Sequence, residues 1–285
     1  MYPTLLSLGK DLQFHAYTVM IALAFLVGVL MACRENEKLA KPYPITPIGG
    51  IWVFFFAVIG AKAYYILQYK SPSQLYEVMY FWGGGLVFFG GLIGGLLGAL
   101  LYLRFARVNP LNLVDVVIPF LPLAHAIARI GCFLNGCCYG SPSDAPWAVA
   151  FPKDSAAYVK HLQGGLVPST ATHSLHVHPT QLYASLGLLC IFFIMRYAYK
   201  RPHRLGTVAL LYPILYGALR FSTEFFRGDS ARSLLSLTVS QVFALTLCLG
   251  GILLYAMLAI LHRNKSEQTE QTATQNAENE GDPAS

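Results

Sequence analysis

Charged residues are scarce in this sequence. They make up 12% of its 285 residues, whereas soluble domains average about 25%. Hydrophobic residues make up 55%, and the mean hydropathy is +0.50. These proportions exclude an ordinary soluble domain and predict a polytopic helical membrane protein. The formal net charge of +6 suits the anionic inner face of a bilayer and requires no nucleic acid.

Features of secreted proteins and of transporters are also missing. The N-terminal segment lacks the basic start and the cleavage site of a secretory signal, so we expect no cleavable signal peptide. No internal repeat is apparent, which disfavours a transporter with two similar halves. The six cysteines form no secreted-type disulfide framework. Cys33, Cys190 and Cys248 stand singly in apolar runs, where a cysteine usually acts as a small buried hydrophobic residue.

Long apolar segments are present instead. They lie near residues 17–33, 49–68, 83–103, 113–133, 180–197, 206–226 and 237–261. The sequence therefore predicts an all-α polytopic membrane protein with about seven transmembrane helices. The loop between residues 140 and 177 contains Trp147, Phe151 and Tyr158, enough apolar surface for a small structured outer loop region.

The distribution of lysine and arginine predicts the orientation of the chain. These residues are concentrated where the odd-numbered spans end. The positive-inside rule then places the N-terminus outside and the C-terminus in the cytoplasm. We expect a single transmembrane domain over residues 1–262. A disordered polar cytoplasmic tail over residues 263–285 should follow, because that segment has no apolar face.

The fourth span carries an arginine inside the membrane. A charged residue at that depth costs roughly 2.5–3.5 kcal/mol on insertion scales, so Arg129 is not expected to face lipid idly. On a helix, His125, Arg129 and Cys132 share one face, with spacing i, i+4 and i+7. Asn135, Gly136 and Gly140 follow and loosen the helix, which frees backbone N–H groups. A fixed cation beside such donors is suited to a lipid phosphate.

The sixth span ends in a charged stripe. Arg220, Glu224 and Arg227 lie at i, i+4 and i+7 on an otherwise apolar helix. A structural ion pair that tolerates burial is one interpretation. The other is an anionic ligand, because one carboxylate leaves part of the positive charge of two guanidinium groups uncompensated.

Polar residues in the first three spans allow more than one interpretation. His15 and Tyr17 fit an aromatic belt at the start of the first span. In the second span, near Tyr65, Lys62 either snorkels to the interface or holds a lipid head group. The third span is rich in glycine. Its small-residue rows, among them Gly90, Gly94 and Gly98, indicate close helix packing, and no Lys or Ser/Thr follows where a phosphate loop would need it.

The stretch that carries Arg129 resembles the signature of the bacterial prolipoprotein diacylglyceryl transferase family, roughly Gly-Arg-Ile-Gly-Asn-Phe-x-Asn-Gly-Glu-x-aromatic-Gly. The matching positions are Arg129, Ile130, Gly131, Phe133, Asn135, Gly136, Tyr139 and Gly140. Ala128, Cys132 and Cys137 depart from it.

Further blocks resemble the family in the family's order. Residues 178–183 resemble its His-Pro-Ser-Gln-Leu-Tyr-Glu motif, with Ala184 in place of the final acid, and residues 147–152 also resemble it. Residues 220–227 match its Arg-x-x-x-Glu-Phe-x-Arg pattern. The family has a functional His-aromatic-Tyr at the start of the first span, which favours a role for Tyr17. Lys62 stands where the family usually has arginine, and Phe89 stands where it has histidine.

The resemblance implies a phosphatidylglycerol–prolipoprotein diacylglyceryl transferase of the bacterial inner (cell) membrane, active in lipoprotein biosynthesis. Such an enzyme moves the diacylglyceryl group of phosphatidylglycerol to the lipobox cysteine of prolipoprotein signal peptides and releases glycerol phosphate. It implies no cofactor and no metal. The implied catalytic residues are Arg129, Arg220, Tyr17, His178 and Glu224. The implied substrate-binding residues are Arg129, Asn135, Gly136, Gly140, Lys62, Tyr65, Arg227, His15 and His125.

Two questions stay open at the level of sequence. Because Phe89 replaces the family's histidine, the acceptor thiol is activated by His15, His125 or His178, or by the positive field alone. The rival interpretation of the chain is a membrane thiol-redox or metal-binding protein. It would use Cys132, Cys137 and Cys138, which lie within seven residues.

Overall fold

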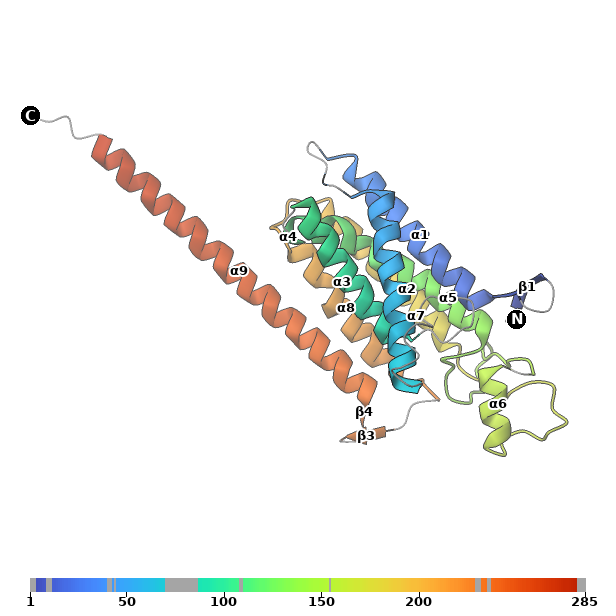
Figure 1. Cartoon of the computed structure of the whole chain (residues 1–285). Helices are drawn as coiled ribbons and strands as arrows, with labels where there is room; N and C mark the ends of the chain where they lie inside the picture. Colours follow the sequence, from blue (N-terminus) through green and yellow to red (C-terminus); the bar gives the residue numbers. More distant parts are fainter. Residues whose placement is uncertain are drawn as a thin grey trace, which may run out of the picture. The chain divides into compact units, whose positions relative to one another are not determined.

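The computed structural model describes residues 4–8, 12–39, 43, 45–69, 87–107, 110–153, 155–228, 232–234 and 237–280. The chain forms two compact units, which divide between residues 135 and 136. Helices dominate both units, and the described residues of each unit include a short two-stranded sheet (Figure 1).

The first unit is a bundle of helices that follows a β-hairpin. Its elements are β1 (Thr4–Leu8), β2 (Leu12–His15), α1 (Ala16–Asn36), α2 (Pro47–Tyr69), α3 (Phe88–Ala106), α4 (Pro110–Val117), the 3₁₀ helix η3 (Ile118–Phe120) and α5 (Leu121–Asn135). Proline has no N–H to donate, so Pro119 and Pro122 favour the short 3₁₀ turn between α4 and α5. In this unit α2 packs on α3, and α1 packs on α5.

Glycines allow α2 and α3 to pack with their backbones in contact. A Cβ added to Gly60 would overlap the carbonyl oxygen of Gly90, and one added to Gly94 would overlap the carbonyl oxygen of Phe56. The expected packing role of the glycine rows is confirmed at these positions. The part of the third span before Val87 lies outside the described residues.

Replacement of Gly94 by alanine is expected to destabilise the protein by about 1–3 kcal/mol, because the added methyl group overpacks the α2–α3 contact. Thermal unfolding of the purified protein in detergent measures the effect. Gly91→Ala is the matched control, since its Cβ would lie 3.5 Å from the nearest atoms of α2, an ordinary contact distance. Equal stabilities of the two variants would contradict the packing role.

The second unit combines a loop region with helices. Its elements are α6 (Ala156–Gln163), α7 (Thr180–Tyr199), α8 (Thr207–Glu224), β3 (Arg232–Leu234), β4 (Leu237–Thr238) and α9 (Val239–Glu280). Helix α8 packs against both α7 and α9. A Cβ on Gly217 would lie 2.7 Å from the carbonyl oxygen of Ala244, so the α8–α9 contact also depends on a glycine.

The loop between residues 140 and 177 is structured, as expected. Val177 pairs with both Pro142 and Val149 in isolated β-bridges. Phe151 is fully buried, and its N–H donates to the Ser174 hydroxyl at 2.9 Å. These pairings fold the loop back on itself, with α6 between its two arms.

Among the described residues, six helical segments are long and apolar enough to cross a membrane: Ala16–Asn36, Pro47–Tyr69, Phe89–Ala106, Leu113–Asn135, Thr180–Tyr199 and Val239–Leu261. Helix α8, the remaining expected span, carries Arg220 and Glu224 and is not among the six. The all-α polytopic class is therefore confirmed. Helix α9 continues to Glu280, and the disordered tail over residues 263–285 stays a prediction.

The orientation of the chain is a separate prediction. We expect the C-terminus in the cytoplasm and the loop containing Trp147 outside, because lysine and arginine flank the cytoplasmic ends of the spans. Reporter fusions at residue 285 and thiol labelling of a cysteine placed at exposed Asp144 would measure it. An external C-terminus would overturn the assignment.

A buried histidine gives the loop a predicted pH response. His161 is 4% exposed, and its Nδ1 accepts the N–H of Leu175 at 3.3 Å. Burial, with a smaller contribution from Lys160, lowers the pKa of His161 below its ordinary 6.5. In the unfolded loop His161 therefore takes up a proton near pH 6.5, whereas in the folded loop it takes up the proton only at a lower pH. Loop stability should be full above pH 6.5 and fall as the pH drops below it.

Limited proteolysis of the loop between pH 8 and pH 5 would test this response. Cleavage should accelerate in acid, and His161→Gln should remove most of the pH dependence. His203→Gln is the control, because His203 is exposed. An unchanged pH profile in the His161 variant would contradict the prediction.

Candidate functional site

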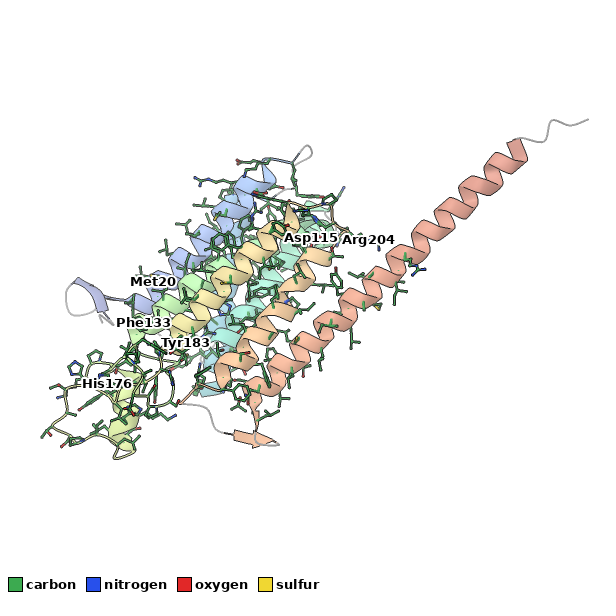
Figure 2. The ribbon with its side chains drawn as sticks, turned by 180° about the vertical axis from the view of Figure 1, so that it is seen from behind. Met20, Asp115, Phe133, His176, Tyr183 and Arg204 are labelled. Carbon is green, nitrogen blue, oxygen red and sulfur yellow. The ribbon has the colours of Figure 1, made fainter. Side chains whose placement is uncertain are left out.

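Helices α1 and α5 bring two distant motifs together in the first unit. A Cβ on Gly131 would lie 2.8 Å from Cβ of Met20 and 3.5 Å from Cα of Tyr17. Helix α1 therefore passes directly over Gly131 of α5. Figure 2 shows Met20 and Phe133 toward the same end of this unit and Asp115 toward the other. The structure thus places the first turn of α1, with Tyr17, beside the helix that carries Arg129.

The face predicted for α5 is present. Because α5 runs from Leu121 to Asn135, His125, Arg129 and Cys132 keep helical spacing. Cys132 is buried, and the two basic side chains are half-buried. Asn135 is the last residue of the helix. His15 ends β2 immediately before α1.

The second span holds a buried ammonium group. Lys62 is 5% exposed, and its Nζ lies 5.7 Å from the ring centroid of Tyr65, within the range of a cation–π interaction. The charge is therefore held against α2 itself. This arrangement is compatible with a head-group contact by Lys62 and Tyr65.

Gly136 begins the loop after α5 and is required there for two reasons. Its φ is +69°, in the left-handed region that favours glycine. A Cβ would also lie 2.8 Å from Cβ of Ser155 and 3.0 Å from the ring of Phe151. The Gly136 carbonyl oxygen accepts the N–H of Ala157 at 3.3 Å, so the loop packs against the start of α6.

Three motifs meet around Gly140 in the second unit. Gly140 donates its N–H to the His178 carbonyl oxygen at 2.9 Å, and His178 donates to the Ser141 carbonyl oxygen at 3.1 Å. Ser141 donates to the Phe226 carbonyl oxygen at 2.8 Å, and Gly140 forms a β-bridge with Arg227. A Cβ on Gly140 would lie 2.6 Å from Cβ of His178. Only glycine fits where these segments cross.

The start of α7 holds the backbone of Cys137 and Cys138. Thr180 Oγ1 donates to the Cys138 carbonyl oxygen at 2.8 Å, and Gln181 Nε2 donates to the Cys137 carbonyl oxygen at 2.7 Å. The sulfur atoms of Cys137 and Cys138 lie within 4.8 Å of each other. Because both contacts use the backbone, they do not require the family's side chain at position 137.

His178 is tied to an aromatic group that sequence reasoning missed. Tyr183 Oη lies 3.1 Å from His178 Nδ1 and accepts Trp147 Nε1–H at 2.7 Å. The ring of Phe226 lies edge-on to both His178 and Tyr183, with centroid separations of 5.4 and 5.9 Å. Tyr183 is at the loop end of α7, near the segment with His176, and Arg204 is at the other end (Figure 2). The resemblance of residues 147–152 and 178–183 to the family was the sequence signal that could have pointed to Tyr183.

The stripe on α8 contains an ion pair. Arg220 Nη2 lies 2.8 Å from Glu224 Oε2, and the carboxylate side chain is fully buried. Thr238 Oγ1 donates to Glu224 Oε1 at 3.0 Å, and Arg220 Nη2 donates to Ser240 Oγ at 3.0 Å. One carboxylate oxygen thus accepts a hydrogen bond and the other faces the guanidinium in the ion pair, which suits a positioning role for Glu224.

The partners of this ion pair are themselves fixed by helix capping. Thr238 precedes α9 and accepts the Gln241 N–H at 3.1 Å, and Gln241 Oε1 accepts the Thr238 N–H at 2.9 Å. This reciprocal pair is a capping box. Sequence reasoning missed Thr238, although its Thr-x-x-Gln spacing is the usual signature of such a box.

Together, the fold and these side chains define a polytopic membrane protein with buried cations, a class in which intramembrane charge usually serves function. The chain matches the family model for prolipoprotein diacylglyceryl transferase over residues 3–257. This chain belongs to the prolipoprotein diacylglyceryl transferase family.

Similar proteins named phosphatidylglycerol–prolipoprotein diacylglyceryl transferase occur in several bacteria. The one from Clostridium tetani is 33% identical over 259 residues, which cover 90% of this chain and 97% of that protein. The one from Bordetella avium is 33% identical over 269 residues, covering 90% and 94%. The one from Methylococcus capsulatus is 31% identical, covering 89% and 94%. These matches do not favour the thiol-redox or metal-binding alternative.

Proposed function

We propose that this protein transfers the diacylglyceryl group of phosphatidylglycerol to the lipobox cysteine of prolipoprotein signal peptides, in the inner membrane of a bacterium. The observation that carries the proposal is similarity over nearly the whole chain to transferases of that name. The meeting of three family-like blocks at Gly140 supports it, because it gives those blocks a common structural purpose.

The chemistry explains the need for fixed positive charge. The acceptor sulfur forms a bond to the terminal glyceryl carbon of the diacylglyceryl group, and the bond between that carbon and the phosphate oxygen breaks. Glycerol phosphate departs with the electron pair, and the thiol proton leaves to a base or to water. A guanidinium group stays charged and can fork onto phosphate oxygens. Arg129 and Arg220 each supply such a group.

The remaining site residues act as supports in this proposal. Glu224 holds the Arg220 guanidinium, and Lys62 with Tyr65 contributes charge and a ring surface for the head group. Tyr17 is in the first turn of α1, which packs against Gly131, and His15 ends β2 just before that helix. His125 and Asn135 both lie on α5, one turn before Arg129 and at the helix end. Arg227, Gly136 and Gly140 form the backbone framework of the loop.

Purified protein supplied with phosphatidylglycerol vesicles and a lipobox peptide provides the test. Mass spectrometry should show a diacylglyceryl increment on the peptide cysteine and none on a peptide with serine at that position. Rescue of a bacterium depleted of its own transferase would extend the result to the inner membrane. A folded protein that adds no lipid from any of several anionic donors would overturn the proposal.

A further inference from the structure

Trp147, Tyr183 and His178 form a hydrogen-bonded chain whose direction follows from the chemistry of its first member. An indole Nε1–H only donates. Tyr183 Oη, 2.7 Å away, must therefore be the acceptor in that contact. The distance is short for an N–H···O bond, which indicates a well-formed interaction.

The position of the tyrosine proton follows next. Tyr183 Oη lies 3.1 Å from His178 Nδ1, and within the described part of the chain no further partner of this hydroxyl is seen. If the hydroxyl donates to Nδ1, the donor left over is Nε2–H, which is then available to a ligand. If instead Nδ1–H donated to the tyrosine, the oxygen would accept twice and its own proton would lack a partner. Only the first arrangement offers an N–H to an anionic ligand, and with such a ligand bound every donor of this hydrogen-bonded chain has an acceptor.

The surroundings hold the imidazole in the orientation that this chain requires. The backbone of His178 is paired on both sides, with Gly140 and Ser141. The Phe226 ring lies edge-on to the imidazole at 5.4 Å, with an interplanar angle of 73°. Rotation of the ring away from Tyr183 would disrupt this contact as well as the hydrogen bond.

We propose that Trp147 and Tyr183 are positioning residues that hold His178 in the tautomer with its proton on Nε2. His178 then offers an N–H donor to a phosphate oxygen, and it does not remove the acceptor thiol's proton. The identity of this ligand rests on the proposed function, and the phosphate belongs either to the donor lipid or to released glycerol phosphate. Thiol activation is left to His15, His125 or the positive field.

The tautomer can be read directly on the full-length protein labelled with ¹⁵N-histidine, at pH 8 and without substrate. His178→Gln identifies the signals of His178. We expect an unprotonated Nδ1 and a protonated Nε2, and Tyr183→Phe should convert the ring to a mixture of tautomers. Tyr197→Phe is the matched control, because Tyr197 lies on the same helix and accepts only from Arg201 in the described structure. A proton on Nδ1, or no change in Tyr183→Phe, would overturn the proposal.

Two substitutions of His178 distinguish a role as hydrogen-bond donor from a role as general base. The amide nitrogen of glutamine reaches the position of Nε2, and that of asparagine reaches the position of Nδ1. His178→Gln should therefore keep more transferase activity than His178→Asn, and Tyr183→Phe should lose roughly 3–10-fold, the loss of one ordinary hydrogen bond. Equal inactivity of both His178 variants would overturn the donor role.

Titration of glycerol phosphate against the lipid distinguishes the two phosphate sources. If Tyr183→Phe weakens product inhibition, the His178 N–H contacts the phosphate of the leaving group. If it raises only the KM for phosphatidylglycerol, the N–H contacts the phosphate of the bound lipid. Either result supports the phosphate contact, and a change in neither constant contradicts it. Wild-type protein without transferase activity would instead remove the proposed function and leave the tautomer measurement intact.

Discussion

Replacement of Arg129 or Arg220 by alanine is expected to lower the transfer rate by about 10²–10³. The estimate follows the cost of losing one preorganised donor to a developing oxyanion, about 3–4 kcal/mol. Arg129→Ala should still insert and fold, whereas Arg220→Ala should also lose stability, because it leaves the fully buried Glu224 carboxylate unpaired. The measurement is the initial rate of peptide lipidation, normalised to the amount of folded protein.

Lysine substitutions and a surface control make this prediction specific. Arg129→Lys and Arg220→Lys should recover little activity, because an ammonium cannot reproduce the bidentate fork of a guanidinium. Arg204→Ala is the matched control, since Arg204 is exposed just before α8 and its side chain donates only to a backbone carbonyl in the described structure. Near-normal turnover of Arg129→Ala or Arg220→Ala would remove that residue from the mechanism. Poor accumulation of Arg129→Ala would indicate a structural role for that residue instead.

Glu224→Ala should have the second large effect, this time on stability. Its carboxylate is fully buried and pairs with Arg220 at 2.8 Å. Removal of one partner of a buried pair leaves an uncompensated charge and costs about 3–5 kcal/mol. Thermal unfolding in detergent should show the loss. Asp144→Asn, which neutralises an exposed carboxylate, should leave stability unchanged.

Glu224→Gln then distinguishes positioning from proton transfer. The amide keeps an oxygen for Thr238 and retains the volume of the side chain, so a positioning role predicts partial activity. Loss of one charge-assisted hydrogen bond corresponds to about 1.5–3 kcal/mol, a rate loss of roughly 10–100-fold. Complete inactivity with normal stability would instead identify Glu224 as a proton acceptor. Since one of its oxygens accepts a hydrogen bond and the other faces the guanidinium in the ion pair, we expect partial activity.

The glycines show how far sequence reasoning could reach. Small residues at spacing four predicted a close helix contact in the third span, and Gly94 lies in such a contact. The sequence could not reveal that Gly140 is where two other motifs cross, because a glycine at the end of a helix also fits a simple cap. Only the pairing of Gly140 with His178 and Arg227 distinguishes the two cases.

The candidate site residues also divide into those that sequence spacing predicted and those that only the structure revealed. The charged stripe of Arg220 and Glu224 follows from helical spacing alone, and the structure pairs these side chains as that spacing requires. Thr238 and Tyr183 were missed as partners. Thr238 lies on a different element from Glu224, and Tyr183 is one polar residue among many. A hydrogen bond between distant segments leaves no periodic signal in the sequence.

The sequence by itself determined the membrane class, the extent of most helices and the family. Apolar composition and helical spacing are local properties, and the motifs are contiguous in the chain. The tertiary structure decided which backbone groups Gly140 pairs with, that Tyr17 lies against the turn of Gly131, and that Trp147 reaches His178 through Tyr183. These contacts join segments far apart in sequence, and they form only when packing brings buried polar groups to the partners that they need.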